Sequence, residues 1–405
     1  MKTDRIEKLG DYLPFSYGKS LLKSKRITTG TFPVYGSNGV IGFHNTYLTD
    51  NFTIIIGRKG TVGSVQFSKT PCWPIDTTFF ISISDLYLAR FAFYSIKSLG
   101  LEKMNSDSAV PGLNRDAAHA RLIRIPPLPE QRAIARILGS LDDKIELNRR
   151  QNVTLEALAR AVFKSWFVDF DPVRAKAAGR APDAMDAATA RLFPDGFEVV
   201  DGREVPRGWG LARLDRITEN PRRSFHPSDV DPKTPYIGLE HMPRKCVALD
   251  DWGSTDTIES NKFGFDRGEI LFGKLRPYFH KVGVAAISGV CSTDILVLRP
   301  TELNWFGFVL AHVSSDEFVQ HTDQSSHGTK MPRTSWKDMA RYQVVLPPEL
   351  VASRYNDFAF PLIQSIVTNV HQSRTLAALR DALLPKLLSG ELRVREAEQV
   401  VEEVL

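Results

Sequence analysis

The chain has 405 residues, with 52 Lys and Arg, 47 Asp and Glu, and a formal net charge of +5. At ~100–200 residues per domain, this length predicts two to four domains, and 42% hydrophobic with 24% charged residues excludes a chain that is disordered throughout. The apolar runs fall far short of the ~18 residues of a membrane span, and the first residues carry no apolar signal segment. We therefore expect a cytoplasmic protein. Its three scattered cysteines, Cys72, Cys246 and Cys291, predict neither a disulfide framework nor a metal site.

An internal repeat organises the chain. Pro126-Pro127 recurs 221 positions later as Pro347-Pro348. The same offset relates further pairs: Pro111 and Pro332, Leu141 and Leu362, Ile145 and Ile366, Asn148 and Asn369, and Ala161 and Ala382. The segments before these match more loosely, with offsets that drift between 216 and 218. The pattern predicts a duplication in the order head, helix, head, helix.

Residues 1–125, the first head, alternate short β-type runs with glycine-rich turns. Strands are expected at 52–56, 62–67 and 79–83, and a helix at 86–96. This segment holds 16 Lys and Arg against 9 Asp and Glu, a net charge of +7. The excess of cations predicts a polyanionic partner, for which nucleic acid is the natural candidate.

Three polar loops of the first head are candidate DNA contacts. The turn Gly57-Arg58-Lys59-Gly60 holds two cations between glycines that permit close approach to a backbone. The other candidates are Asn38 in a turn and Lys103, Asn105 and Ser106 in a later loop. A solvated turn or a plain surface loop explains any one of these positions as well.

A long helix is expected over 126–167, because the stretch from Glu130 to Trp166 lacks proline and repeats apolar residues at alternate spacings of four and three. The positions assigned to helix pairing and partner binding are Leu138, Ile145, Asn148, Leu155, Phe163 and Trp166. Residues 168–205, rich in Ala, Asp, Pro and Gly, are read as a linker with a short helical piece.

Residues 206–346, the second head, are again β-rich, with strands expected at 269–272, 281–286 and 295–298 and a helix at 305–313. The head contains 18 Lys and Arg against 17 Asp and Glu, so its net charge is only +1. Cations and polar residues nonetheless recur at the places equivalent to those of the first head. The candidate DNA contacts here are Lys274, Arg276, Tyr278, Ser326, His327, Lys330 and Arg333.

The second long helix is expected over 347–390, with Leu362, Ile366, Asn369, Leu376 and Leu383 assigned like their counterparts, followed by an acidic tail over 391–405. We expect the two helices to pair antiparallel about a pseudo-twofold, as a rod of roughly 55 Å at ~1.5 Å per residue. The polar Asn in each seam would fix their register. The alternative is that each helix packs only on its own head.

No sequence motif for catalysis is present. The chain lacks a GxxxxGK[ST] phosphate loop, HExxH, GxSxG and GxGxxG, and its histidines do not stand at ligand spacings. We therefore expect a non-catalytic chain that binds neither a metal nor a cofactor of its own.

Several segments resemble a known family. Ile125–Gln131 (IPPLPEQ), Trp166–Ala175 (WFVDFDPVRA) and Leu383–Leu392 (LLPKLLSGEL) are similar to the central and distal regions of type I restriction–modification specificity subunits. The second copy departs from the pattern, because Glu349-Leu350-Val351 stands where the first has Leu128-Pro129-Glu130. The heads match the family only in outline.

The resemblance implies an α+β fold with two β-rich target recognition domains separated by two long antiparallel coiled-coil helices. It implies a subunit that recognises a bipartite, gapped sequence in double-stranded DNA and recruits two methyltransferase subunits, which would bring restriction and translocase subunits. S-adenosylmethionine, ATP and magnesium would belong to those partners. The alternative is a non-enzymatic protein-interaction scaffold whose two heads bind peptides or proteins.

Overall fold

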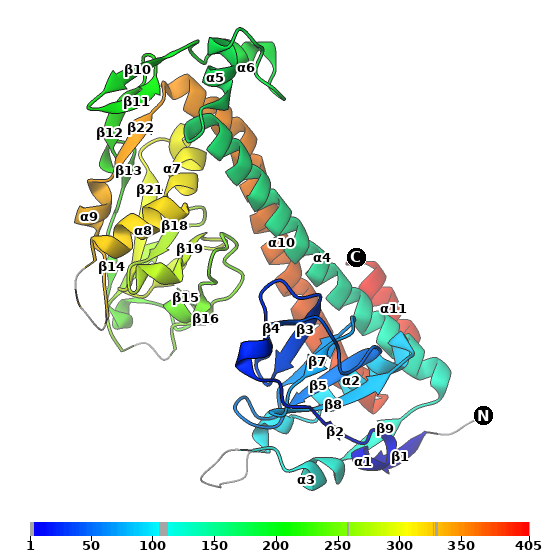
Figure 1. Ribbon diagram of the computed structural model, residues 1–405. Coiled ribbons are helices and arrows are strands. Elements are labelled where there is room, and N and C mark those ends of the chain that lie inside the picture. Colours follow the sequence, from blue (N-terminus) through cyan, green and yellow to red (C-terminus); the bar gives the residue numbers. More distant parts are fainter. Residues whose placement is uncertain (1–3, 105–111, 257–258, 327, 329–330, 405) are drawn as a thin grey trace. The chain divides into compact units, whose positions relative to one another are not determined.

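The computed structural model describes residues 4–104, 112–256, 259–326, 328 and 331–404. The chain divides into two compact units, one formed by residues 1–145 with 375–405 and the other by residues 146–374. The first head lies in the first unit, the second head lies in the second, and each unit contains part of both long helices (Figure 1). The two units are described separately below.

The first unit is built on three sheets and a packed helix. A four-stranded antiparallel sheet has the order β2 (Ser16–Tyr17), β8 (Thr78–Ile83), β5 (Phe52–Gly57) and β6 (Val65–Ser68). A three-stranded sheet consists of β4 (Gly39–His44), β3 (Phe32–Gly36) and β7 (Trp73–Pro74), and a third pairs β1 (Arg5–Lys8) with β9 (Leu122–Ile125). The short helices are α1 (Leu9–Tyr12) and α3 (Arg115–His119).

Helix α2 (Leu86–Lys97) joins the sheet of the first unit to its long helices. It begins at Asp85, whose carboxylate accepts hydrogen bonds from the backbone N–H groups of Tyr87 and Leu88. Ala92 and Ile96 pack into the cluster formed by the four-stranded sheet. Phe91 and Tyr94, on another face, pack against the long helices, so α2 is buried on both sides.

The second unit repeats this plan. Its four-stranded antiparallel sheet has the order β13 (Thr218–Glu219), β21 (Ile295–Pro300), β18 (Ile270–Gly273) and β19 (Val282–Val284). A five-stranded sheet contains β14 (Ser224–Phe225), β17 (Lys262–Phe265), β20 (Gly289–Cys291), β15 (Pro235–Ile237) and β16 (Gly253–Ser254), and β12 (Gly210–Arg213) pairs with β22 (Gln343–Leu346). The helices are α7 (Phe306–Val313), α8 (Asp316–Gln324) and α9 (Trp336–Ala340).

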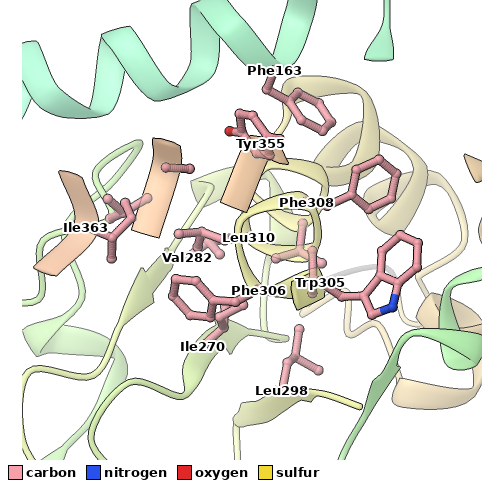
Figure 2. Packing of buried hydrophobic residues seen from close by; sticks show 14 of the residues in the cluster. Phe163, Ile270, Val282, Leu298, Trp305, Phe306, Phe308, Leu310, Tyr355 and Ile363 are labelled. Carbon is pink, nitrogen blue, oxygen red and sulfur yellow. The ribbon is translucent and has the colours of Figure 1, made fainter. Parts of the chain in front are cut away.

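The core of the second unit is centred on α7, which is apolar on nearly every side. Phe306, Phe308 and Leu310 project from it into one cluster (Figure 2). The sheet contributes Ile270, Val282 and Leu298, and the long helices contribute Phe163, Tyr355 and Ile363 (Figure 2). The second head is therefore packed directly onto both helices.

The internal repeat predicted from the sequence is confirmed by the topology of the two heads. The four-stranded sheets have the same strand order, and in each head a further sheet contains one parallel pair, β3 with β7 and β15 with β20. Helix α9 corresponds to α3, and strand β22 corresponds to β9, each 221 positions later in the chain. The strands and helices expected at 52–56, 79–83, 86–96, 295–298 and 305–313 are confirmed with shifts of a residue or two.

The two long helices are α4 (Leu128–Phe167), of 40 residues, and α10 (Glu349–Ser389), of 41 residues. Within the second unit they run antiparallel, because Asn148 bonds to Ser373, Asn152 to Asn369, and the carbonyl of Ala159 to Tyr355. The predicted α+β fold with two paired helices is confirmed. In the part of the chain that the structure describes, no helix combines the length and the apolar character needed to cross a membrane.

The segment 168–205, expected as a linker, is a packed part of the second unit. It contains α5 (Asp171–Ala177), α6 (Ala187–Arg191) and the hairpin of β10 (Phe197–Val200) with β11 (Arg203–Pro206). Phe170, Val173 and Phe193 are buried in the same cluster as Phe163. The composition suggested a linker because these few apolar residues are separated by Ala, Asp and Gly.

The acidic tail is likewise ordered over most of its length. Helix α11 (Val394–Glu402) buries Ala397 and Val401 against the long helices of the first unit. Glu396 and Glu402 are exposed, so this part of the acidic tail is an amphipathic helix.

Candidate nucleic-acid interface

In the first head, the turn that follows β5 carries Arg58 and Lys59. The backbone N–H groups of both residues donate to the carbonyl of Thr77, at 2.9 and 3.1 Å, and the carbonyl of Arg58 accepts from Leu113 N at 2.9 Å. A Cβ atom at Gly57 would stand 2.1 Å from the carbonyl oxygen of Thr61. The turn therefore requires glycine at Gly57, and its backbone is fixed while Lys59 is exposed and Arg58 is half-buried.

Tyr17, at the edge of the same sheet, lies close to two guanidinium groups. The carbon Cζ of Arg58 is 5.3 Å from the centre of the Tyr17 ring, and that of Arg115 is 5.2 Å from it. Phe79 supports the ring edge-on at 5.0 Å, and Tyr17 remains 52% exposed. An exposed aromatic ring held by two arginines can stack on a base while the cations contact phosphates.

The other loops singled out in the first head lie against this turn. The side chains of Ser64 and Gln66, which follow the turn, both donate to the carbonyl of Ser37, beside Asn38. The backbone of Leu101 and Glu102 packs so closely on Gly63 that a Cβ there would meet it at 2.2 Å. The structure thus brings the loops of Asn38, Arg58, Lys59 and Lys103 together, whereas Asn105 and Ser106 lie outside the described residues.

The second head holds Lys274, Arg276 and Arg333 in the equivalent arrangement. Lys274 N donates to the carbonyl of Asp294 at 2.9 Å, and the carbonyl of Lys274 accepts from Thr334 N at 3.0 Å. These bonds match those that the backbone of Arg58 makes in the first head. The β-bridge between Leu275 and Arg333 likewise corresponds to the β-bridge between Lys59 and Gly112. Arg276 N donates to the carbonyl of Pro332 at 2.7 Å, which ties the two loops together.

Aromatic and cationic side chains gather beyond this turn. Tyr278 is 50% exposed and meets the ring of Phe279 edge-on at 4.7 Å. Cζ of Arg244 lies 4.0 Å from the centre of the Phe279 ring. Burial, together with the charge of Arg244, lowers the pKa of the neighbouring Lys281 amine. Tyr278, Phe279 and Arg244 thus form a cationic and aromatic cluster close to the turn.

Ser326, another candidate of the second head, bonds within its own loop. It follows α8, and its hydroxyl donates to the carbonyl of Asp323 at 2.6 Å. His327 and Lys330, from the same loop, lie outside the described residues.

Most of the candidate cations lack acidic partners. Among the residues that the structure describes, no carboxylate pairs with the side chains of Lys59, Lys103, Lys274 or Arg276, whereas Arg333 pairs with Asp294 at 3.4 Å. In contrast, Arg223 and Arg299 on the second head are bound to Asp266 and Glu269. The unpaired cations are available to a polyanion.

Two residues of this interface, Tyr17 and Arg115, were missed in the sequence. They lie 41 positions before and 57 positions after Arg58, and only folding brings them together. Arg244 was missed for the same reason. An exposed aromatic in a strand and an arginine at the start of a short helix give no local signal of binding.

The helix residues assigned to partner binding face the interior of the chain. The following are buried or half-buried in the seam and in the cluster around it: Leu138, Ile145, Asn148, Leu155, Phe163, Trp166, Ile366, Asn369, Leu376 and Leu383. Leu362 is half-buried, and its neighbour Ile363, rather than Leu362 itself, belongs to the buried cluster. Most of these side chains lie between the two helices, so their assignment to a partner surface is corrected, except that Leu155 and Asn369 also reach an open groove.

The outward face of the helix pair in the second unit offers a different surface. Leu147, Val153 and Leu158 of α4 are 48%, 66% and 46% exposed. Leu147, Arg150 and Leu155 of α4 line a groove of about 520 Å³ with Ser365 and Asn369 of α10. Exposed apolar side chains next to an open groove are typical of a protein-binding surface.

Comparisons with known proteins agree with this arrangement. Residues 3–157 match the family model described as the type I restriction modification DNA specificity domain. The chain is 26% identical over 361 residues to the specificity subunit of the type I restriction enzyme MjaIX of Methanocaldococcus jannaschii, covering 85% of this chain and 78% of that protein. It is 27% identical over 334 residues to the HindI specificity subunit of Haemophilus influenzae, covering 70% of this chain and 71% of the relative.

A solved structure shows the same fold. The specificity subunit of a type I restriction–modification system from M. genitalium superposes with a TM-score of 0.59 at 15% identity, covering 95% of this chain and 96% of that one. The similarity therefore extends over both heads and both long helices.

Proposed function

The chain belongs to the specificity subunits of type I restriction–modification systems, and from this we propose that it selects the DNA sequence on which a restriction–modification complex acts. The observation that carries the proposal is the repeated cationic turn. Arg58 and Lys274 occupy the same hydrogen-bonded position in two homologous heads, each directly after a central strand of a four-stranded sheet, β5 in the first head and β18 in the second. Two similar but non-identical heads predict a target made of two different half-sites separated by a gap.

The two heads would use different chemistry on their half-sites. The first head offers an arginine-flanked Tyr17, and the second offers Tyr278 and Arg276 on its own turn. Unpaired lysines such as Lys59 and Lys274 would contact phosphates and supply affinity that falls with salt. Base contacts by arginine and polar side chains would supply the choice of sequence.

The long helices would bind two modification (methyltransferase) subunits, and through them restriction and translocase subunits. Their buried seam is occupied by the chain itself, so the proposed docking surface is the outward face with Leu147 and Leu158. S-adenosylmethionine, ATP and magnesium would be bound by those partners, and this chain would contribute recognition without catalysis.

Selection from random duplexes tests the proposal. The full chain, together with the modification subunits of its own system, would be incubated with a library of random double-stranded DNA, and the bound fraction sequenced. We expect enrichment of one motif with two fixed half-sites and a gap of constant length. A complex that binds all duplexes equally, or that selects one uninterrupted motif, contradicts the proposal and favours a protein-interaction scaffold.

A further inference from the structure

The cationic turns of the two heads share a backbone path but differ in the residues that take it. In the first head, Gly60 and Gly63 have φ angles of 81° and 73°. In the second head, Arg276 and His280 take the corresponding left-handed positions, with φ angles of 51° and 53°. Matching hydrogen bonds establish this equivalence. Gly57 N donates to the carbonyl of Ser64, which follows Gly63, and Gly273 N donates to the carbonyl of Lys281, which follows His280, both at 2.8 Å.

Glycine adopts this conformation freely, whereas a residue with a Cβ is strained in it. The second head therefore places two strained residues where the first head shows that glycine suffices. Such strain persists only where the surrounding structure or the function requires the side chain.

The fold accounts for His280. Its ring is 4% exposed, one ring nitrogen lies 2.9 Å from the carbonyl of Ser314, and the other lies 3.3 Å from Asp316. These contacts tie the turn to α8 and compensate the strain at His280.

The fold does not account for Arg276. Within the described residues no acceptor binds its guanidinium, and the Nε atom is buried without a hydrogen-bond partner. Its guanidinium lies 5.9 Å from the centre of the Phe279 ring, which Arg244 already covers at 4.0 Å. A strained arginine with an unused donor fork is thus held beside the exposed Tyr278 and the unpaired Lys274.

We propose that Arg276 is the base-reading residue of the second head, with its guanidinium donating to a pair of acceptors on a base edge in the half-site that this head binds. The chemistry of the planar fork fits the O6 and N7 atoms of guanine in the major groove. This rests on the proposed DNA-specificity function and goes beyond it, because it assigns one half-site contact to one side chain. The first head, with glycine at the equivalent position, reads its half-site through other residues.

Three variants of the full chain, each assembled with its modification subunits, test the assignment. Arg276→Gly removes the fork and relieves the strain, and Arg276→Lys keeps the charge without the fork. Arg222→Gly is the matched control, because Arg222 is also left-handed, with a φ of 45°, but lies beside Phe263 on another sheet. The probes are the duplex selected by the wild-type complex and its single-base-pair variants, and the readouts are affinity, its salt dependence and the thermal unfolding midpoint.

We expect Arg276→Gly to unfold no earlier than the wild type, while discrimination at one base pair of one half-site falls by roughly 10- to 100-fold. Arg276→Lys should lose the same discrimination with a smaller loss of affinity, and Arg222→Gly should keep it. Unchanged discrimination in Arg276→Gly overturns the assignment. The assignment is also overturned if Arg276→Gly loses the same affinity for every duplex and its binding depends less on salt, because that result indicates a phosphate contact. A wild-type complex without sequence preference would instead remove the proposed function.

Discussion

Asn369 on α10 donates a hydrogen bond to Asn152 on α4 at 2.9 Å, inside the seam of the two long helices. One turn away, Asn148 donates to Gln372 and Ser373 at 3.0 and 3.2 Å. By the repeat offset of 221, Asn148 corresponds to Asn369 and Asn152 corresponds to Ser373. The same pair of positions therefore meets twice with the helices exchanged, as a pseudo-twofold axis requires.

The hydrogen-bonded polar side chains in the seam, here called the polar layer, make a prediction about helix pairing. Asn148 is fully buried, so Asn148→Ala leaves a cavity and removes two hydrogen bonds, and we expect a loss of about 1–3 kcal/mol in the free energy of unfolding. Chemical denaturation followed by circular dichroism measures this. Val153→Ala, at a position that is 66% exposed on the same helix, is the control and should change stability little. Equal effects of the two substitutions would show that the layer does not hold the helices.

The turn of the first head predicts a salt-dependent contact. Arg58→Ala combined with Lys59→Ala removes two cations while the backbone bonds to Thr77 and Leu113 remain. We expect weaker DNA binding and a reduction of up to ~2 in the slope of log affinity against log salt. Titrations of the complex at several salt concentrations measure the slope. An unchanged slope would exclude this turn from the interface.

Gly57 predicts a steric effect on the same head. In Gly57→Ala the new methyl group would meet the carbonyl of Thr61 at 2.1 Å, so the turn must move, and we expect a loss of roughly 1–3 kcal/mol in stability together with weaker DNA binding. Gly210→Ala, whose Cβ would find open space, is the matched control. Differential scanning calorimetry compares the two variants, and a Gly57→Ala protein as stable as the control would contradict the geometry.

Glu156 on α4 predicts a pH dependence. Glu156 is 9% exposed, and its carboxylate accepts a hydrogen bond from Val247 N at 3.0 Å and pairs with Arg160. Burial nevertheless outweighs both contacts and raises the pKa of the carboxyl above the ordinary 4.5. The folded state disfavours the charged form of Glu156. The contribution of this group to stability is therefore fully present below its ordinary pKa and is lost as pH rises through the raised pKa. Glu156→Gln should therefore unfold at a higher temperature than the wild type at pH 8. This advantage should shrink toward pH 4.5, and an advantage that is absent at pH 8 would contradict the prediction.

The sequence predicted most of the framework because local patterns determine it. The long helices follow from apolar spacing without proline, and the repeat follows from pairs such as Asn148 and Asn369 at one offset. The packing of the segment 168–205 was not predicted, because Phe170, Val173 and Phe193 contribute to a core only after α5 and α6 fold back on the second head.

The candidate interface was predicted only where one turn carried its own signal. Arg58 and Lys59 share a glycine-flanked turn, so they were found together. Tyr17 and Arg115 are brought to Arg58 by strand pairing and by the bridge between Lys59 and Gly112, which no local pattern shows. The strain at Arg276 depends on its φ angle, which the sequence does not reveal.

The most direct test of the central claim is a map of modified bases in the genome of cells that carry this gene, compared with cells from which it has been deleted. We predict one gapped motif that is modified when the gene is present and unmodified when it is absent. In cells that carry the Arg58→Ala, Lys59→Ala variant, modification of that motif should fall while the variant protein remains present. Identical maps with and without the gene would contradict the assignment of this chain as the subunit that chooses the DNA sequence.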